Sequence, residues 1–503
     1  MNPVRNDNVY GNKGKQGQIT TSTNISNGVN DLNDEGIPTV QKQSNLNIPE
    51  DIIEAKKKSL HYSIIEGGAA SVMGGFGDSK IGYFAIFLNA SNPLIAFLAA
   101  FPPVIGTLTQ LISVKILDRS GKRKPLILPG VIINMLMWLP IFLLPFLFPA
   151  AGPVLLIIAV VVSTGAVNFS IPAWNSLMGD LTEPAKRGRY FAKRNIFVMS
   201  FSWISTVAAY GVLEYFKLTN EWIGFGIIFG VAFISRGVSA YYLKKMVEPA
   251  YVAKKDDYFS FWDFLRRSPK SNFAHFVFYV ALITLAVNIS GPFFAVYMIR
   301  DLKFSYTQIA IIDTGQIVIQ ILMMRYWGGL CDRYGNRSVL SFTGWLISFV
   351  PILWLISPNF YAIIMFQVFA GLIWSGFSLA AGNFIFDAVS PPKRARCVAY
   401  FTLINTLGLF FGSIFGGWIS LYLPNQLSLF GWSMVLASSL QVLFLISGLL
   451  RLLISSIFLS HIKEVRKVEC ITTWELIYNF SMIKPVLGPI FDVFTGGKED
   501  KES

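Results

Sequence analysis

Charged residues are scarce in this chain, and their scarcity excludes most classes of soluble protein. Only 14% of its 503 residues are Asp, Glu, Lys or Arg, whereas a soluble domain carries roughly 25%. Three stretches hold no charged residue at all, namely 125–179, 338–386 and 397–450. A membrane-spanning helix needs about 20 apolar residues, so each stretch has room for two such helices and a turn. The sequence therefore predicts an integral membrane protein that crosses the bilayer several times.

Histidine and cysteine are also rare, which limits the chemistry that the chain can perform. There are three histidines, and the three cysteines (Cys331, Cys397 and Cys470) lack the spacing of metal ligands. Neither an H-E-x-x-H motif nor a G-x-x-x-x-G-K-[ST] nucleotide-binding loop occurs. We therefore expect no metal site, no cofactor, no use of ATP by this chain and no enzymatic activity.

Basic residues cluster in alternate loops between the apolar stretches, and this pattern predicts the orientation. The loops on one side carry most of the Lys and Arg, whereas the other side holds little beyond Lys217, Arg300 and Lys303. Because basic loops stay on the cytoplasmic side, both termini are predicted to be cytoplasmic, in a multi-pass protein of the cell membrane. The same loops account for the net charge of +13 without nucleic acid, and they favour contact with anionic lipids of the inner leaflet.

The chain is predicted to be all-α, with about twelve transmembrane helices in two six-helix bundles, the last helix at 430–457. Residues 1–58 are polar and are predicted to form a disordered cytoplasmic tail. After His461, apolar residues recur near helical spacing among basic ones, which predicts an amphipathic helix on the inner membrane surface, with a regulatory docking helix as the alternative. The predicted organisation is 1–58 N-terminal tail, 59–246 first bundle, 247–271 cytoplasmic linker, 272–460 second bundle and 461–503 C-terminal tail.

Two motifs occur twice, in the same order, and indicate an internal repeat. The first is a charged loop, LDRSGKRK at Leu117–Lys124 and WGGLCDRYGNRSVL at Trp327–Leu340, which we call the two Asp-Arg loops. The second is D-x-x-x-P-x-K-R-x-R, at Asp180–Arg189 and again at Asp387–Arg396. The offsets between copies are 332 − 118 = 214 and 387 − 180 = 207. The chain is therefore predicted to be a tandem repeat of two bundles.

These motifs resemble the major facilitator superfamily, whose loop after the second span reads G-x-x-x-D-R-x-G-x-R. The second Asp-Arg loop matches fully, and the first matches except that Val114 stands at the glycine position. The matching residues are Gly328, Asp332, Arg333, Gly335 and Arg337 in the second loop and Asp118, Arg119, Gly121 and Arg123 in the first. The resemblance implies secondary active transport of a small solute by two rocking halves.

The carboxylates of these motifs lie at helix ends, where they can bind cationic neighbours and helix N-termini. We therefore predict a cytoplasmic gate that holds one conformation and breaks in the other. The alternative is that the basic residues only fix the orientation. Besides the loop residues, the predicted gate contains Asp180, Arg187, Asp387 and Arg394.

Polar residues within the apolar stretches are the candidates for solute or ion binding, because they are costly in a bilayer. Asp78 follows a glycine-rich segment, and Asp313, Gln316 and Gln320 share one helical face. Lys80 is expected to point away from Asp78. The other candidates are Asn168, Trp174, Arg236, Asn288 and Asn383. For each, the alternative is a packing contact or, for Arg236, a side chain that reaches the inner surface.

The sequence thus predicts a secondary active transporter of a small solute. Transport is expected to be coupled to an ion, with a proton as the first candidate, through Asp78 and Asp313. A carboxylate in a dry cavity can take up and release a proton. The alternatives are a transport-inactive sensor or a lipid flippase on the same scaffold, and then a membrane-embedded enzyme. The solute, the direction of transport, the coupling ion and the oligomeric state are not predicted.

Overall fold

The computed structural model describes residues 50–183, 187–249, 266, 271–389, 391–424, 426–429, 432–466 and 468. Residues from Glu50 onward group into one compact unit. Most of the predicted N-terminal tail, most of the predicted linker and nearly all of the C-terminal tail, with Cys470, lie outside the described residues.

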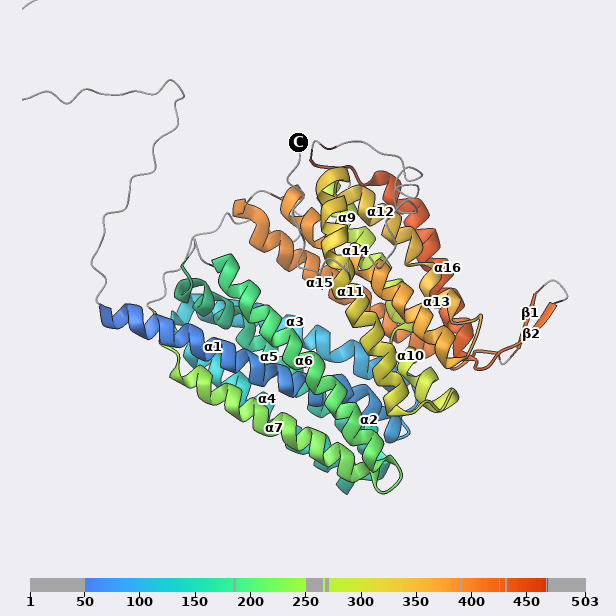
Figure 1. The fold of residues 1–503 in the computed structure, drawn as a ribbon, viewed down its shortest axis with the longest axis horizontal. Helices are drawn as coiled ribbons and strands as arrows, with labels where there is room; N and C mark the ends of the chain where they lie inside the picture. Colours follow the sequence, from blue (N-terminus) through green and yellow to red (C-terminus); the bar gives the residue numbers. More distant parts are fainter. Residues whose placement is uncertain are drawn as a thin grey trace, which may run out of the picture. The chain divides into compact units, whose positions relative to one another are not determined.

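The first half of the described chain is a bundle of long helices (Figure 1). Within it, α3, α4 and α5 pack together, and α1 packs against α6 and α7. The elements are α1 (Glu50–Phe76), η1 (Asp78–Lys80), α2 (Ile81–Phe87), α3 (Asn92–Ser120), α4 (Lys124–Leu147), η2 (Pro149–Ala151), α5 (Gly152–Leu181), α6 (Arg187–Lys217) and α7 (Glu221–Lys245).

The second half repeats this arrangement and adds one small hairpin. Here α9 packs against α15 and α16, and α14 packs against α11 and α12. The elements are α9 (Asn272–Ser290), α10 (Phe293–Val296), η4 (Tyr297–Asp301), α11 (Tyr306–Tyr334), α12 (Asn336–Leu346), α13 (Phe349–Leu353), α14 (Phe360–Ala388), α15 (Pro391–Ile419), β1 (Gln426–Leu429), β2 (Trp432–Val435), α16 (Leu440–Phe458) and η5 (Leu459–His461).

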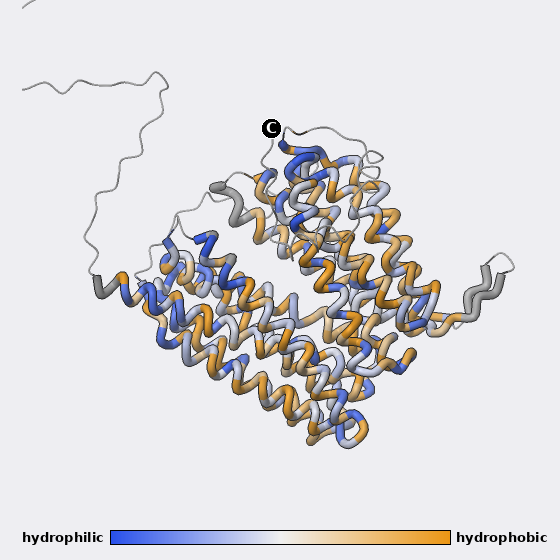
Figure 2. Tube along the Cα trace, in the orientation of Figure 1, coloured by the Kyte–Doolittle hydropathy of each residue, from blue (hydrophilic) through white to orange (hydrophobic). Residues whose placement is uncertain are grey.

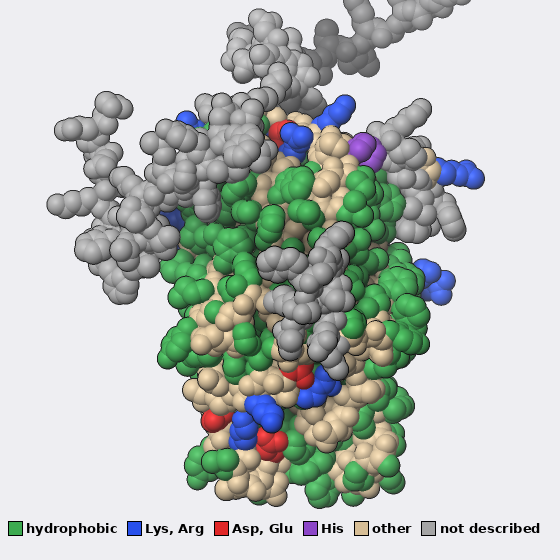
Figure 3. Space-filling model, turned by 90° about the vertical axis from the view of Figure 1, so that its right-hand side faces the viewer, with side chains coloured by type: hydrophobic (Ala, Val, Ile, Leu, Met, Phe, Trp, Pro, Cys, Tyr) green, Lys and Arg blue, Asp and Glu red, His purple; other side chains and the backbone are tan. Residues whose placement is uncertain are grey.

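The described residues contain ten helices that are long and apolar enough to cross a membrane. Two further spans are broken: the first runs through α1, η1 and α2, and the ninth through α12 and α13. Together they make the predicted twelve. Hydrophobic residues occur along the helices, hydrophilic ones gather near many helix ends (Figure 2), and large apolar side chains cover much of the outer face (Figure 3).

The two halves meet along two helix pairs, α3 with α15 and α6 with α11. In the order of spans these are the second with the eleventh and the fifth with the eighth. The repeat relates the second span to the eighth and the fifth to the eleventh, so it converts one pair into the other. We call the end of the molecule with Gly121 and Gly335 the basic end, and the end with Asn89 and Lys303 the opposite end.

A ladder of glycines joins α15 to α9. Gly408, Gly412 and Gly416 each face a backbone carbonyl of α9, those of Ala281, Leu285 and Ile289 in turn. Both sets recur every four residues, so the two helices run side by side with no room for a Cβ atom. Small residues at this spacing allow close helix approach.

This ladder makes a testable prediction about stability. Gly412→Ala should lower the thermal unfolding temperature by several degrees, because its Cβ would overlap the Leu285 carbonyl oxygen. Gly211→Ala is the matched control, since nothing lies within 4 Å of a Cβ there and alanine favours helix by about 1 kcal/mol. Dye-monitored unfolding of the purified protein compares the two. Equal effects would show that the ladder is not closely packed.

Three boundaries differ from the sequence prediction. Helix α1 begins at Glu50, inside the tail predicted for 1–58, and its first turns carry a Lys58–Glu54 ion pair of 2.7 Å. The last span begins at Leu440 and not at residue 430, because an antiparallel hairpin, Gln426 opposite Val435, occupies the charge-free run. Residues 462–466 are not helical and contact the second half through specific polar groups, so the predicted amphipathic helix does not begin there.

Candidate functional site

A buried cluster of ionisable side chains joins the two halves near the opposite end. Lys80 is fully buried, and its Nζ lies 3.0 Å from the centroid of the Tyr210 ring. The Tyr210 hydroxyl is 2.6 Å from Asp313 Oδ2 and 2.8 Å from the Tyr83 hydroxyl. Lys80, Tyr83 and Tyr210 belong to the first half and Asp313 to the second. The cluster is therefore a polar contact across the interface between the two halves, which we call the seam. This contact must break if the halves move apart at this end.

Lys80 is the least expected member of this cluster. Among the described residues, no hydrogen-bond acceptor lies within range of its buried Nζ. The cost of burying its charge is offset by a cation–π contact with the face of the Tyr210 ring and by electrostatic attraction to Asp313. An ammonium group without a hydrogen-bonding partner is costly to bury, and such residues within membrane spans mark functional positions. Lys80 was expected to point away from Asp78, and its Nζ faces Tyr210 and Asp313 instead; what the sequence did not predict is that Lys80 is buried.

A cavity of about 480 Å³ lies beside this cluster and brings together two of the predicted residues. Asp78 and Asn168 both line it, with Asn134 and Ser163, which are joined by a 2.8 Å hydrogen bond. Pro292, which follows the break after α9, contributes from the second half. The lining offers a carboxylate, two amides and hydroxyls on an apolar wall, which are the groups expected around a polar solute.

The other predicted residues of the first half form a separate buried network. Arg236 is 5% exposed and donates to Ser239, 3.3 Å away, which in turn lies 3.2 Å from Glu66. Arg236 also interacts electrostatically with Asp78. Glu66 forms a 3.2 Å ion pair with Arg194. Arg236 is therefore buried and does not reach the surface as the alternative proposed.

Trp174 does not line the cavity. Its ring lies 4.7 Å from the guanidinium carbon of Arg194, so it belongs to the network of Glu66. In the second half, Asn288 Nδ2 donates to its own helix at Thr284 O, 2.8 Å away. Gln316, Gln320 and Asn383 are half-buried. Asp313 is thus the predicted residue of the second half that the structure connects to the first.

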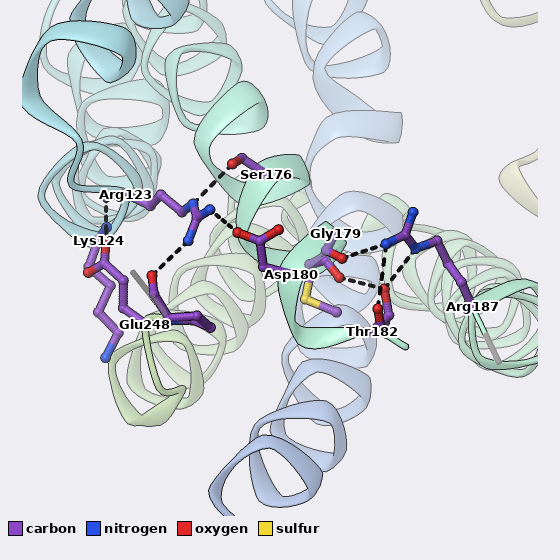
Figure 4. A network of polar contacts seen from close by, with 10 residues as sticks. Arg123, Lys124, Ser176, Gly179, Asp180, Thr182, Arg187 and Glu248 are labelled. Atoms are coloured by element: carbon purple, nitrogen blue, oxygen red, sulfur yellow. Dashed lines mark hydrogen bonds and ion pairs between the residues drawn. The ribbon is translucent and has the colours of Figure 1, made fainter. Parts of the chain in front are cut away.

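At the basic end, Arg123 holds the first Asp-Arg loop against two other segments (Figure 4). The Arg123 side chain is 1% exposed and forms an ion pair with Asp180. It also donates to Ser176 Oγ at 3.0 Å and to Pro249 O at 2.9 Å. Gly121 ends α3 at φ 62°, a left-handed conformation that favours glycine. Arg187 donates to Gly179 O, 2.6 Å away, at the end of α5.

The equivalent cluster of the second half uses a different arginine. Asp387 accepts from Asn336 Nδ2 at 2.5 Å and forms an ion pair with Arg466, whose Nε lies 3.1 Å away. Arg466 follows the last span and also donates to Cys331 O at 2.8 Å. Arg337, the sequence equivalent of Arg123, donates instead to Ile462 O at 2.7 Å. The ion pairs of both clusters therefore lie within one half each, and neither joins the halves in this conformation.

The remaining gate residues are more exposed. The Asp332 side chain is 82% exposed and lies 3.9 Å from Arg466. Arg333 lies over the Tyr334 ring at 5.0 Å, and Gly335 has a φ of 84°. Asp118 and Arg119 are exposed, and a Cβ atom at Gly328 would meet the Leu379 side chain at 4.0 Å. The side chain of Arg394 lies outside the described residues.

A pair of glutamates completes the repeat at the basic end, and sequence reasoning missed both. Glu248, after α7, accepts from the backbone N–H groups of Arg123 and Lys124 at the start of α4. Glu464, after the last span, accepts from the N–H of Arg337 at 2.8 Å at the start of α12. A carboxylate stabilises a helix N-terminus. The offset of 464 − 248 = 216, close to those of the two motifs, was the available signal.

Comparisons with known proteins agree with this architecture. Residues 276–473 match the sequence model of the Major Facilitator Superfamily. The second half of the chain therefore resembles this superfamily in sequence. A bacterial homologue of the iron transporter ferroportin, in its inward-facing state, superposes with a TM-score of 0.63 at 13% identity, over 82% of this chain and 100% of that one. The nucleoside transporter NupG superposes with a TM-score of 0.58 at 13% identity, over 81% and 99%.

Sequence similarity to curated transporters is local. The "Putative transporter svop-1" of Caenorhabditis elegans is 24% identical over 139 residues, which is 27% of this chain and 25% of that relative's length. The likeness to the solved transporters shows that the chain shares their fold, and ten helices of its described residues are long and apolar enough to cross a membrane. Among the described residues, no group of three or more His, Cys, Asp or Glu side chains could hold a metal ion.

Proposed function

We propose that this chain is a secondary active transporter that carries a small solute across the cell membrane by alternating access, with proton coupling. The superfamily and its transporter relatives support a membrane transporter rather than an enzyme. The clustering of Lys and Arg at one end supports an orientation with that end, and both termini, in the cytoplasm. The solute cavity is the space lined by Asp78 and Asn168.

The contact between Tyr210 and Asp313 carries the proposal of coupling. It joins the two halves, and Lys80 lies beneath the Tyr210 ring within the attraction of Asp313. A proton bound to Asp313 would cancel the charge that attracts Lys80, so the seam at the opposite end would loosen. Release of the proton would restore the attraction and close the seam. Alternating access then follows from a charge that exists in one protonation state and not in the other.

The solute cavity supports a polar cargo. Asp78 places a carboxylate at one wall, and Arg236 lies close enough to influence it electrostatically. The amides of Asn134 and Asn168 and the hydroxyl of Ser163 can donate and accept hydrogen bonds. A solute that binds here contacts mainly the first half and reaches Pro292 of the second, so its binding can favour a state in which the two halves approach.

The clusters at the basic end have a supporting role in this scheme. Arg123 with Asp180, and Arg466 with Asp387, brace the loops of their own halves. Each half can therefore move as a rigid body, and the gate predicted from the sequence would form when the two braced ends meet. That role is part of the proposal.

Reconstitution tests the transport function. A panel of small polar solutes is first screened for an increase in the unfolding temperature of the purified protein, because a bound solute stabilises the native state. Solutes that stabilise are then offered to proteoliposomes with an acidic exterior. We expect concentrative uptake that a protonophore abolishes. Correctly folded protein that takes up no solute of a broad panel, with or without a pH gradient, would contradict the proposal.

A further inference from the structure

A second pocket, of about 500 Å³, lies between the two halves at the opposite end. The first half contributes the segment around Asn89 and two side chains of α6 and α7, Lys217 and Glu221. The second half contributes the stretch from Val296 to Tyr306. The pocket shares only the side chain of Ile95 with the solute cavity. It is therefore a separate space, on the other side of the buried residues of the seam.

Basic residues of the opposite end line this pocket. Lys217, Arg300 and Lys303 are the three that the sequence assigns to the less basic side of the membrane, and all three line it. Glu221 is the acidic residue in its lining, so the lining side chains alone give a net charge of 3 − 1 = +2. Just outside the lining, Asp301 pairs with Arg300 and Glu214 binds the backbone N–H of Tyr306. Figure 3 shows Lys and Arg side chains among Asp and Glu side chains near the lower end of the face that it draws. A concave surface with excess positive charge attracts anions.

The local contacts hold these cations in place. Arg300 donates from Nη1 to Asn92 Oδ1 at 3.0 Å, which ties the second half to the start of α3. Its Nε lies 3.3 Å from Asp301, whose other oxygen is held by Ser438. Lys217 Nζ lies 5.6 Å from the centre of the Tyr306 ring. Arg300 is therefore held by two neighbours, and Lys217 of the first half lies near an aromatic ring of the second.

Backbone strain provides an independent observation. Two non-glycine residues in the described part of the chain have a positive φ, Asn89 at 56° and Lys303 at 54°. Both line this pocket, one from each half. Such conformations cost of the order of 1 kcal/mol and concentrate at ligand-binding sites. Their coincidence at one pocket favours a binding role over a chance gathering of exposed lysines.

We propose that this pocket binds a small soluble anion with carboxylate or phosphate groups, held by Lys217 from the first half and by Arg300 and Lys303 from the second. A bound anion would bridge the halves and stabilise the conformation in which they meet at this end. Phosphate and carboxylate oxygens suit these cations, and arginine can bind them through two parallel hydrogen bonds. The site is distinct from the solute cavity and does not depend on which solute is carried.

Titration of the purified full-length protein tests this site. Sodium citrate and sodium phosphate are added at constant ionic strength, with sodium chloride as the reference, and the unfolding temperature is recorded. We expect a saturable increase with citrate or phosphate. Removal of two cations, in Arg300→Gln with Lys303→Gln, should weaken the apparent affinity about tenfold or more. The matched control, Arg119→Gln with Lys122→Gln, removes the same charge from the basic end and should bind as the wild type does.

One further variant and one comparison of lipids complete the test. Glu221→Gln removes the acidic lining residue and should tighten anion binding, so the site can be tested even if the double variant folds poorly. Nanodiscs of neutral lipid and of phosphatidylglycerol separate a soluble anion from a lipid headgroup, since only a headgroup would stabilise the protein without added citrate. No saturable effect, equal weakening by both double variants, or stabilisation by anionic lipid alone would overturn the proposal.

Discussion

Replacing Asp313 by asparagine is expected to open the seam at the opposite end and to remove the pH dependence of its opening. The carboxylate attracts Lys80 and accepts from Tyr210 across the two halves. Asparagine lacks the charge, so Lys80 would lose the attraction that offsets its burial, and an uncompensated buried charge is costly. The open conformation, in which water reaches Lys80, should then be favoured at every pH.

Spin labels at Leu218 and Ile356 can measure this opening. Both side chains are exposed at the opposite end, one on each half, and serine replaces the three native cysteines. In the wild-type protein, lower pH should increase the population with the longer distance, because protonation of Asp313 cancels its attraction for Lys80. The ionisable side chains that surround Asp313 are Lys80, Tyr83, Tyr210 and Tyr306. Asp313→Asn should show the longer distance throughout.

A double-mutant cycle separates this coupling from a general loss of structure. Lys80→Met alone and Asp313→Asn alone should each lower the unfolding temperature, whereas the double variant should recover much of that loss. The expected interaction energy is about 0.5–3 kcal/mol, the range for residues in one network, because Tyr210 contacts both side chains. Tyr210→Phe, which removes only the bridging hydroxyl, should have an intermediate effect. Strictly additive effects of the two substitutions would show that Lys80 and Asp313 do not act as a pair.

Asp387→Asn and Asp332→Asn are expected to have very different effects, although both belong to the predicted gate. Asp387 is 21% exposed, accepts a hydrogen bond from Asn336 and forms an ion pair with Arg466. Loss of the ion pair and weakening of the charge-assisted hydrogen bond should lower stability by about 1.5–3 kcal/mol. Asp332 is 82% exposed with one partner at 3.9 Å, and such surface pairs contribute about 0–1 kcal/mol.

Unfolding temperatures of the two variants, measured together, distinguish a structural brace from a charge that serves only the transport cycle. If Asp332→Asn folds as the wild type does but transports slowly, Asp332 acts in the other conformation, as a gate would require. If it also transports at the wild-type rate, the gate hypothesis fails for this residue. A stability loss at Asp332 equal to that at Asp387 would contradict the contacts described for the two side chains.

The fold was predictable from the sequence because its determinants are local. Charge-free stretches, basic loops and the repeated Asp-Arg loops report on span number, topology and duplication without reference to tertiary contacts. The hairpin at Gln426–Val435 escaped prediction because its sequence is as free of charge as the spans beside it. Composition distinguishes membrane-embedded segments from water-exposed ones well, but it does not distinguish a helix from a short apolar hairpin.

The candidate site was only partly predictable, and Lys80 shows why. Lys80 was expected to point away from Asp78, and it does not line the cavity that Asp78 lines. Its burial against the Tyr210 ring depends on a helix far away in the sequence and was not predictable. Tyr83 and Tyr210 are ordinary apolar-face residues in the sequence, and their contact joins positions 127 residues apart. Asp78 and Asn168 were identified separately, and only the tertiary structure places them in one cavity.

Glu248 and Glu464, which each follow the last span of their half, also affect the order in which the chain folds during synthesis. The first half can be completed once Glu248 has left the ribosome, before any helix of the second half exists, because the groups that cap α4 are then all present. The second half receives its equivalent cap from Glu464 and its brace from Arg466, both beyond the last span. A chain cut at residue 460 would retain all twelve spans and still lack the closing contacts of its second half.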